Sequence, residues 1–454
     1  MSNKITNRKF RENNIPDKSQ EIARELFSFI ESSPTAFHVV DTMKRMLEAE
    51  GYQQLLESRE WELEAGGKYY VTRNGSSLLA FRVPKKEFNG FQIMASHSDS
   101  PAFKIKENPE IEVEGTYVKL NVEKYGGMLC APWFDRPLSV AGRLILKTEG
   151  GIVTRLIDVD RDLVLIPSLA IHMDHKANEE QKINVQKDML PLYGMADGEK
   201  TLMQTVAEVA GVTDEEILGS DLFVYNRQKG SVWGANEEFI SSGRLDDLQC
   251  VFGSLKGFLA AAEGDSIPVH CVFDNEEVGS STKQGAASTF LQDTLVRICE
   301  SMGKTPAQYR QALASSFMVS ADNAHAVHPN YGEKSCPTNR PVLNGGIVIK
   351  YSANQKYTTD GVSAALFRTI CERAEAPCQV FLNRSDMTGG STLGNLSANQ
   401  VAVNCVDIGL PQLAMHSPYE TAGVKDTEYL IRAAKAFFES TVRETANGEY
   451  EIIG

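Results

Sequence analysis

The feature that most constrains the fold of this chain is a set of apolar runs that end at acidic residues or histidine. Three runs share this pattern: residues 91–95 before His97, residues 269–273 before Glu276 and Glu277, and residues 317–320 before Asp322. Such runs are typical of buried strands, and helical patterns separate them in the second half of the chain. The alternation predicts a three-layer α/β domain with a largely parallel sheet. Ligands bind at the C-terminal edge of such sheets, so these side chains predict a functional site.

A fourth apolar run, residues 401–406, is followed ten residues later by His416. We expect this run to be another strand of the same sheet, which would bring His416 towards the same edge.

The pattern changes between Ala102 and Gly234, where short β-type runs such as residues 163–166 alternate with glycine-rich turns. This predicts a β-rich domain inserted into the α/β domain, with a long polar loop at residues 174–188. We therefore expect three segments, which are residues 1–102 and 235–454 for the two parts of the catalytic α/β domain and residues 103–234 for the insertion.

The charge of the chain limits its partners. It has 46 Lys and Arg against 60 Asp and Glu, a formal net charge of −14. Nucleic acids and anionic membranes both favour basic surfaces, so we expect neither as a partner. No apolar run reaches the ~18–20 residues of a membrane helix, and residues 1–17 lack the apolar segment of a signal peptide. The eight cysteines are scattered without a CxxC pair, which is typical of buried free thiols in a cytoplasmic protein.

The acidic residues and histidines have the chemistry of a metal site. A carboxylate pair at a buried strand end is costly unless it is paired or binds a metal. Oxygen and imidazole ligands without thiolates suit zinc, cobalt or manganese. A two-metal site needs a bridging carboxylate and about two further ligands for each ion. Five residues would fill these places: His97, Asp246, Glu277, Asp322 and His416.

Two further residues have expected roles beside this set. Glu276, next to a ligand, would be free to act as a general base, and Asp99 could orient the imidazole of His97. Each residue also has a simpler explanation. The Glu276-Glu277 pair could be solvated on a surface turn, a lone histidine could be structural, and Asp246 could cap a helix.

At this point the chain resembles a known family, the aspartyl aminopeptidases, and looks like a bacterial-type member. These are zinc aminopeptidases that assemble into tetrahedral dodecamers. The matching motifs occur in the same order over most of the chain, and they are residues 33–38, 96–101, 244–248, 274–280, 322–330 and 415–418.

The resemblance implies a role for each predicted site residue. It implies two zinc ions, one bound by His97 and Asp322, the other by Glu277 and His416, and both bridged by Asp246. It also implies that Glu276 is the base, that Asp99 orients the imidazole of His97 without binding the metal itself, and that the inserted domain makes oligomer contacts. Asp247 departs from the family pattern, which often has Asn there, and its carboxylate could pair locally.

Two more residues match family positions that contact the substrate. His172 matches a segment that reaches the active site of a neighbouring subunit, and Lys350 matches the position associated with a substrate carboxylate. Without the resemblance, His172 would be a solvated loop residue and Lys350 a lysine exposed at a strand end. The glycine-rich segment 386–392 could place backbone amides near the substrate.

The expected function is release of N-terminal residues from peptides with a free N-terminus, with a preference for Asp and Glu. The expected cofactor is two zinc ions per subunit, for which cobalt or manganese could substitute, and the expected assembly is a homo-dodecamer. Three alternatives remain open: an aminopeptidase of the same family that prefers neutral residues, a related two-metal deacylase, and a non-enzymatic assembly protein.

Overall fold

The computed structural model describes residues 18–198, 200–387 and 389–454, so the predicted absence of a signal segment in residues 1–17 concerns residues outside this range. The largest sheet has nine strands, and its central strands are parallel. Across the sheet the strands are β1 (Gln53–Leu55), β2 (Lys68–Arg73), β3 (Ser77–Arg82), β13 (Ile267–Phe273), β4 (Phe91–His97), β14 (Phe317–Ala321), β18 (Asn404–Gly409), β16 (Ile347–Lys350) and β17 (Cys378–Phe381).

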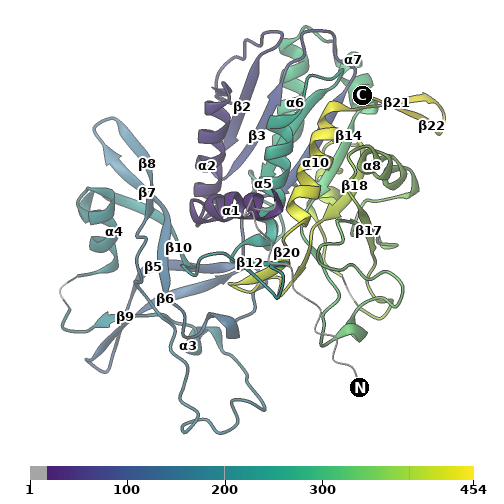
Figure 1. Cartoon of the computed structure of the whole chain (residues 1–454). Helices are drawn as coiled ribbons and strands as arrows, with labels where there is room; N and C mark the ends of the chain where they lie inside the picture. Colours follow the sequence, from purple (N-terminus) through teal and green to yellow (C-terminus); the bar gives the residue numbers. More distant parts are fainter. Residues whose placement is uncertain (1–17, 199, 388) are drawn as a thin grey trace, which may run out of the picture.

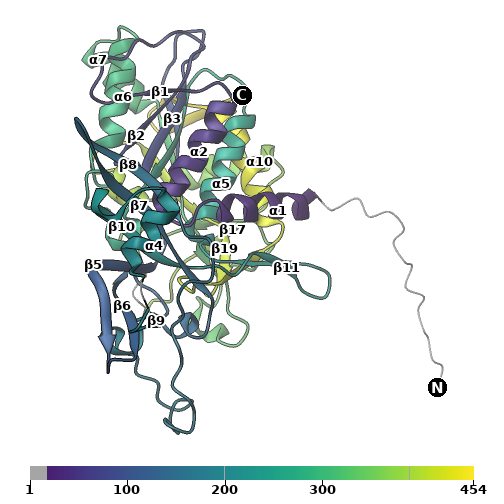
Figure 2. The same ribbon diagram turned by 90° about the vertical axis from the view of Figure 1, so that its left-hand side faces the viewer.

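Helices cover both faces of this sheet (Figures 1 and 2). The face that carries Met94 and Val319 packs against α1 (Lys18–Glu31), α2 (Ala36–Ala49), α5 (Leu245–Ala260), α8 (Gly361–Arg373) and α10 (Asp426–Glu439). The opposite face, with Ile93 and Met318, packs against α6 (Phe290–Ser301), α7 (Pro306–Ala314) and α9 (Leu393–Ser397). Neighbouring residues enter different cores because side chains alternate along a strand. The three-layer α/β fold predicted from the sequence is therefore confirmed.

A second, six-stranded sheet lies to one side of α1 and α2 in Figure 1. All of its strand pairs are antiparallel, and across the sheet the strands are β8 (Gly151–Asp158), β7 (Leu138–Thr148), β10 (Ile217–Asn226), β5 (Ala102–Val113), β6 (Tyr117–Tyr125) and β9 (Leu192–Met195). It has its own apolar core, to which the short helix α4 (Leu202–Ala210) contributes. These strands lie where the sequence predicts the insertion, and the exact domain boundaries stay a prediction.

A third, five-stranded sheet is assembled from distant parts of the chain. Across it the strands are β11 (Ser231–Trp233), β12 (Phe239–Ser242), β20 (Glu420–Gly423), β19 (Pro411–Leu413) and β15 (Ala324–His325). His416 lies in the turn between β19 and β20. The chain ends in a hairpin of β21 (Thr441–Ala446) and β22 (Glu449–Ile453).

Some local expectations were wrong. Of residues 163–166, the last three form isolated bridges, to Leu138, Leu192 and Phe134, rather than a strand. The strand predicted at residues 401–406 instead begins at Asn404 and continues to Gly409. The loop predicted at residues 174–188 ends in a short helix, α3 (Val185–Asp188).

The structure can be compared with the expectations of buried free thiols and of no membrane helix. All eight cysteines lie in the described residues and are free, but Cys130, Cys336 and Cys378 are only partly buried. Among the described residues, every helix is too short or too polar to cross a membrane.

Candidate metal centre

The parallel strands carry the predicted residues to one edge of the large sheet. His97 is the last residue of β4, and Asp322 directly follows β14. Glu276 and Glu277 follow β13 in the 3₁₀ turn η3 (Glu276–Val278). These strands run side by side in the same direction, so their C-terminal ends lie together.

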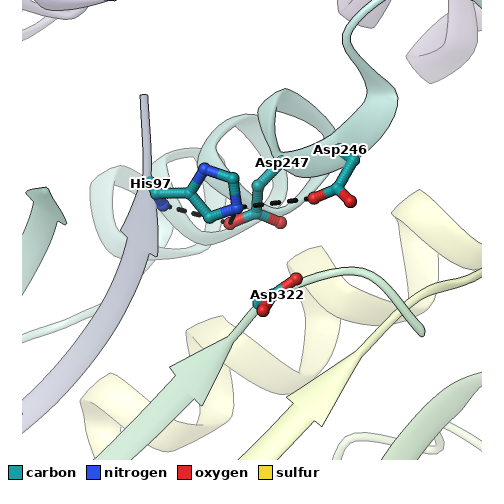
Figure 3. A group of neighbouring side chains, drawn as sticks. All are labelled: His97, Asp246, Asp247 and Asp322. Atoms are coloured by element: carbon teal, nitrogen blue, oxygen red, sulfur yellow. Dashed lines mark hydrogen bonds and ion pairs between the residues drawn. The ribbon is translucent and has the colours of Figure 1, made fainter. Parts of the chain in front are cut away.

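Asp246 reaches the same edge from the first turn of α5, where residues 246 and 247 have non-helical backbone angles. Figure 3 shows His97, Asp246, Asp247 and Asp322 pointing toward one another from a strand, a helix and a loop. The alternative that Asp246 only caps a helix is therefore insufficient, because its side chain faces the cluster.

The two histidines present the same ring atom to Asp246. His97 Nε2 lies 3.4 Å from Asp246 Oδ1, and His416 Nε2 lies 3.6 Å from Asp246 Oδ2. The opposite ring nitrogens face backbone carbonyl oxygens. His97 Nδ1 is 3.0 Å from the backbone oxygen of Asp99, and His416 Nδ1 is 2.6 Å from the backbone oxygen of Gly127. A carbonyl can only accept a hydrogen bond, so each Nδ1 donates to it and each Nε2 is the ring atom left to face the carboxylates and, in the neutral imidazole, to bind a metal. This arrangement is typical of metal-binding histidines.

The possible ligand atoms form three overlapping groups, and Asp246 belongs to two of them. The groups are His97, Asp246, Asp247 and Asp322; Asp246, Glu277 and His416; and His97, Glu276 and Glu277. Within each group the atoms lie within 4.8 Å of one another. Glu277 Oε1 is 3.3 Å from His416 Nε2. The predicted ligands thus come together in the pairs expected for two ions, with Asp246 shared between them.

The buried oxygens of this cluster have the chemistry that a cation requires. Asp246 Oδ1, Asp247 Oδ1 and Glu277 Oε1 are buried and accept no hydrogen bond from the described residues. Burial first, and then the neighbouring carboxylates, raises the pKa of Asp247 and Glu277 well above the usual range. Unpaired buried charge is costly, and a divalent cation would remove that cost. The donor set of oxygen and imidazole fits zinc.

Asp247 was expected to pair locally, and it does so inside the cluster. Its side chain is fully buried, and Oδ2 accepts a hydrogen bond from the His97 backbone N–H at 3.1 Å. The same oxygen lies 4.0 Å from His97 Nε2. Asp247 therefore fixes the end of β4 and places a further carboxyl group beside the predicted ligands.

Asp99 holds the turn that carries the predicted base. Its Oδ1 accepts from the Glu276 N–H at 3.0 Å, and its Oδ2 accepts from the Glu277 N–H at 3.1 Å. Burial, together with the nearby carboxylates of Asp322 and Asp99, raises the pKa of Glu276 to about 8. A bound cation would offset this repulsion and leave the Glu276 carboxylate able to accept a proton.

A cavity of about 320 Å³ opens beside the cluster and is lined by Asp246, Glu276, Asp322, Lys350 and His416. The simpler alternative of a lysine exposed at a strand end does not hold, because Lys350 is only 3% exposed. Its Nζ donates to the Asn323 carbonyl oxygen at 2.8 Å and lies 3.7 Å from Asp322 Oδ2. Lys350 thus places a cation in the wall of the cavity.

The rest of the cavity wall is mixed. Tyr357 and Phe381 form an apolar part of it, and residues 390–392 of the predicted glycine-rich segment form another part. Thr388 of that segment lies outside the described residues. His172 is exposed on the long loop before α3 and is absent from the lining of this cavity among the described residues.

Sequence reasoning missed three residues that support the site. Glu420 is buried and accepts from the backbone N–H groups of Asp246 and His416, at 2.9 and 2.8 Å. Tyr125, at the end of β6, contacts Asp99, and Gly127, two residues later, contacts His416. Glu420 lies four residues after His416 and could have been considered, but no local pattern marks Tyr125 or Gly127.

Comparisons with known proteins show the family to which the chain belongs. Residues 29–438 match the family model described as aminopeptidase I zinc metalloprotease (M18). The probable M18 family aminopeptidase 2 of Clostridium novyi (strain NT) is 46% identical over 426 residues, covering 92% of this chain and 98% of the relative. The counterpart in Pseudomonas aeruginosa (strain UCBPP-PA14) is 42% identical over 429 residues, covering 93% and 99%.

The fold is also similar to that of a solved structure. The mApe1 dodecamer of S. cerevisiae matches with a TM-score of 0.83 at 29% identity, covering 93% of this chain and 97% of that one.

Proposed function

The chain belongs to the M18 family of zinc aminopeptidases, and from that premise we propose that each subunit uses two zinc ions to release single N-terminal residues, preferably Asp or Glu. The observation that carries the two-metal proposal is the position of Asp246. Its two oxygens face the Nε2 atoms of two different histidines, and each histidine has its own carboxylate partner nearby. A bridging carboxylate with separate ligands on each side is the pattern of co-catalytic sites.

The proposed mechanism assigns different work to neighbouring carboxylates. Zinc, when bound by the two ligand groups, would lower the pKa of a water and polarise the substrate carbonyl. Glu276 would take the proton of that water and deliver it to the leaving amine. Asp99 would keep the base in place through the backbone of the η3 turn. The neighbouring Glu277 lies 3.3 Å from His416 Nε2 as its proposed co-ligand, so the role of proton carrier falls to Glu276 in this mechanism.

Lys350 supports the acidic preference. A buried ammonium in the wall of a cavity of about 320 Å³ favours a side chain that ends in a carboxylate. Burial opposes the charge, but Asp322 and further anionic neighbours raise the pKa of Lys350, so it stays protonated. The competing feature is that Asp322 and the Asn323 carbonyl already use part of its hydrogen-bonding capacity. Tyr357 and Phe381 would favour neutral side chains if that competition prevailed.

We also propose a homo-dodecamer of cytoplasmic subunits. The S. cerevisiae neighbour is a dodecamer, and it covers nearly all of this chain. His172, exposed on its loop, would then reach the active site of an adjacent subunit. The eight free thiols suit a reducing compartment. Light scattering of the full chain should give the mass of twelve subunits, and a monomer would contradict the assembly.

One experiment tests the catalytic proposal. Protein freed of metal is loaded with zinc in steps, and hydrolysis of aspartyl, glutamyl, leucyl and lysyl chromogenic substrates is measured alongside bound zinc. We expect activity to follow occupancy up to two zinc ions per subunit, to favour the acidic substrates, and to disappear with a chelator. Full activity at one ion would contradict the two-zinc mechanism, and preference for the leucyl substrate would contradict the acidic pocket.

The deacylase alternative gives a different result in the same assay. It would cleave N-acyl amino acids and spare peptides with a free amine.

A further inference from the structure

The second sheet contributes directly to the candidate metal centre. Tyr125 is the last residue of β6, and its hydroxyl donates to Asp99 Oδ2 at 2.7 Å. Two residues later, the Gly127 carbonyl accepts from His416 Nδ1. The two contacts fall on opposite halves of the site, because Asp99 adjoins His97 and His416 pairs with Glu277. The β6 end therefore touches the supports of both predicted ion positions.

Asp99 is the point through which Tyr125 can influence several groups at once. Its carboxylate is 4% exposed and holds the backbone N–H groups of Glu276 and Glu277. Asp99 Oδ1 also lies 3.4 Å from His97 Nδ1. A carboxylate that rotated away would release the turn that carries the proposed base, while the Asp99 backbone carbonyl would still hold His97 Nδ1 at 3.0 Å.

The direction of the Tyr125 hydroxyl is fixed by its other partner. Asn275 Nδ2 donates to the Tyr125 oxygen at 2.9 Å, so the hydroxyl proton is left to point at Asp99. The ring is held by an edge-on contact with Phe223, with ring centres 5.7 Å apart. Burial first, and then the charge of Asp99, raises the pKa of Tyr125, which keeps the phenol protonated.

We propose that Tyr125 is a positioning residue for the metal centre: its hydroxyl, at the end of a strand of the second sheet, holds the Asp99 carboxylate in the orientation that fixes the Glu276-Glu277 turn, which carries the proposed base and a proposed ligand. The inference rests on the proposed two-zinc function. It gives the inserted sheet a role inside its own subunit, in addition to any contact between subunits.

Tyr125→Phe removes the hydroxyl and retains the ring. Supporting partners of metal ligands typically account for about 10–100-fold in affinity or activity, so we expect zinc affinity and kcat to fall by about that factor. Zinc affinity is measured by competition with a chromogenic chelator, independently of activity.

Tyr225→Phe is the matched control. Tyr125 and Tyr225 both line a second cavity, of about 280 Å³, and the Tyr225 hydroxyl donates to Asp158 at 2.7 Å, not to a support of the metal site. We expect zinc affinity and kcat of this variant within about twofold of the wild type, since a contact of similar strength is lost elsewhere. Equal losses in both variants would overturn the proposal, because they would reflect general loosening of the cavity.

A double-mutant cycle tests the route through Asp99. If Tyr125 acts by holding Asp99, then Tyr125→Phe should change zinc affinity far less in an Asp99→Asn background than in the wild type. Fully independent effects would overturn the proposed route, as would a Tyr125→Phe variant with unchanged zinc affinity. A wild-type protein that bound no zinc would instead overturn the proposed function itself, and this is determined before any variant is compared.

Discussion

At the scale of single residues, the neighbours Glu276 and Glu277 face different partners. Glu277 lies 3.3 Å from His416 Nε2, whereas Glu276 lines the cavity and has an oxygen within 4.8 Å of a ring nitrogen of His97. Glu276→Gln removes a proton acceptor but leaves the proposed ligands in place. We expect bound zinc to stay unchanged and kcat to fall by about 10²–10⁴-fold, the usual contribution of a general base.

Glu277→Gln is the matched comparison for this prediction, since it alters a proposed ligand one residue away. We expect it to lose zinc affinity as well as activity, and both proteins are compared by metal analysis after dialysis. Wild-type activity in Glu276→Gln would show that another group accepts the proton.

Lys350 is the residue on which the substrate preference depends. Lys350→Met removes the buried ammonium and keeps much of its length. We expect the ratio of kcat/KM for aspartyl over leucyl substrates to fall at least about tenfold, because a buried charge-assisted contact is worth 2–5 kcal/mol or more. The ratio is the informative quantity, since weaker support of Asp322 would lower both rates together.

Lys356→Met serves as the control for Lys350→Met, because Lys356 is exposed on a nearby loop and does not line the cavity. Its ratio should equal that of the wild type. If Lys350→Met lowered both rates equally along with zinc content, Lys350 would act only through Asp322, and the acidic preference would need another explanation.

At the scale of the elements, β13 carries a second histidine whose role is structural. His270 is fully buried, contacts Ser254 Oγ at 2.9 Å and packs near Phe258. Burial lowers the pKa of His270 to about 3. The unfolded chain therefore binds a proton at higher pH than the folded chain does, so the stabilisation present above about pH 6.5 is lost as the pH falls towards 3.

His270→Gln should remove this acid sensitivity. Between pH 7.5 and pH 5, we expect the wild type to lose about 2 kcal/mol more than the variant, from the difference in proton binding. Urea unfolding at the two pH values measures the difference, and His175→Gln, at an exposed loop position, should resemble the wild type. Parallel losses in all three proteins would contradict the assignment.

The elements also show which parts of the site were predictable from sequence. His97, Asp322 and the Glu276-Glu277 pair follow buried strands, so the apolar runs located them and parallel pairing brought them together. His416 was expected from the run before it, but it reaches the site from the turn between β19 and β20 in another sheet.

The contacts between the sheets have no recognisable pattern in the sequence. Tyr125 lies 150 residues before its partner Asn275, and its role depends on how the second sheet packs against the first. The burial of Lys350 likewise follows from the tertiary position of β16, because a four-residue strand has no pattern that separates a buried end from an exposed one.

At the scale of the whole molecule, the exposed position of His172 has a specific consequence. Within one subunit His172 is absent from the cavity beside the metal cluster among the described residues, although the sequence predicts that it contacts substrate. If it serves a neighbouring subunit, His172→Ala should lower activity only through the assembly. Co-assembly of His172→Ala subunits with Glu276→Gln subunits should then restore activity that neither variant has alone.

The expected recovery can be calculated. In a random equal mixture, half of the sites keep Glu276, and half of their neighbours keep His172, so about a quarter of wild-type activity should return in a closed assembly. Mixing intact, separately assembled variants is the control, since subunits that do not exchange cannot complement one another. If His172 acted within its own subunit, every site in the mixture would lack either the base or the histidine, and activity would stay at the level of the single variants. Complementation thus separates a shared active site from an isolated one with no structure of the assembly required.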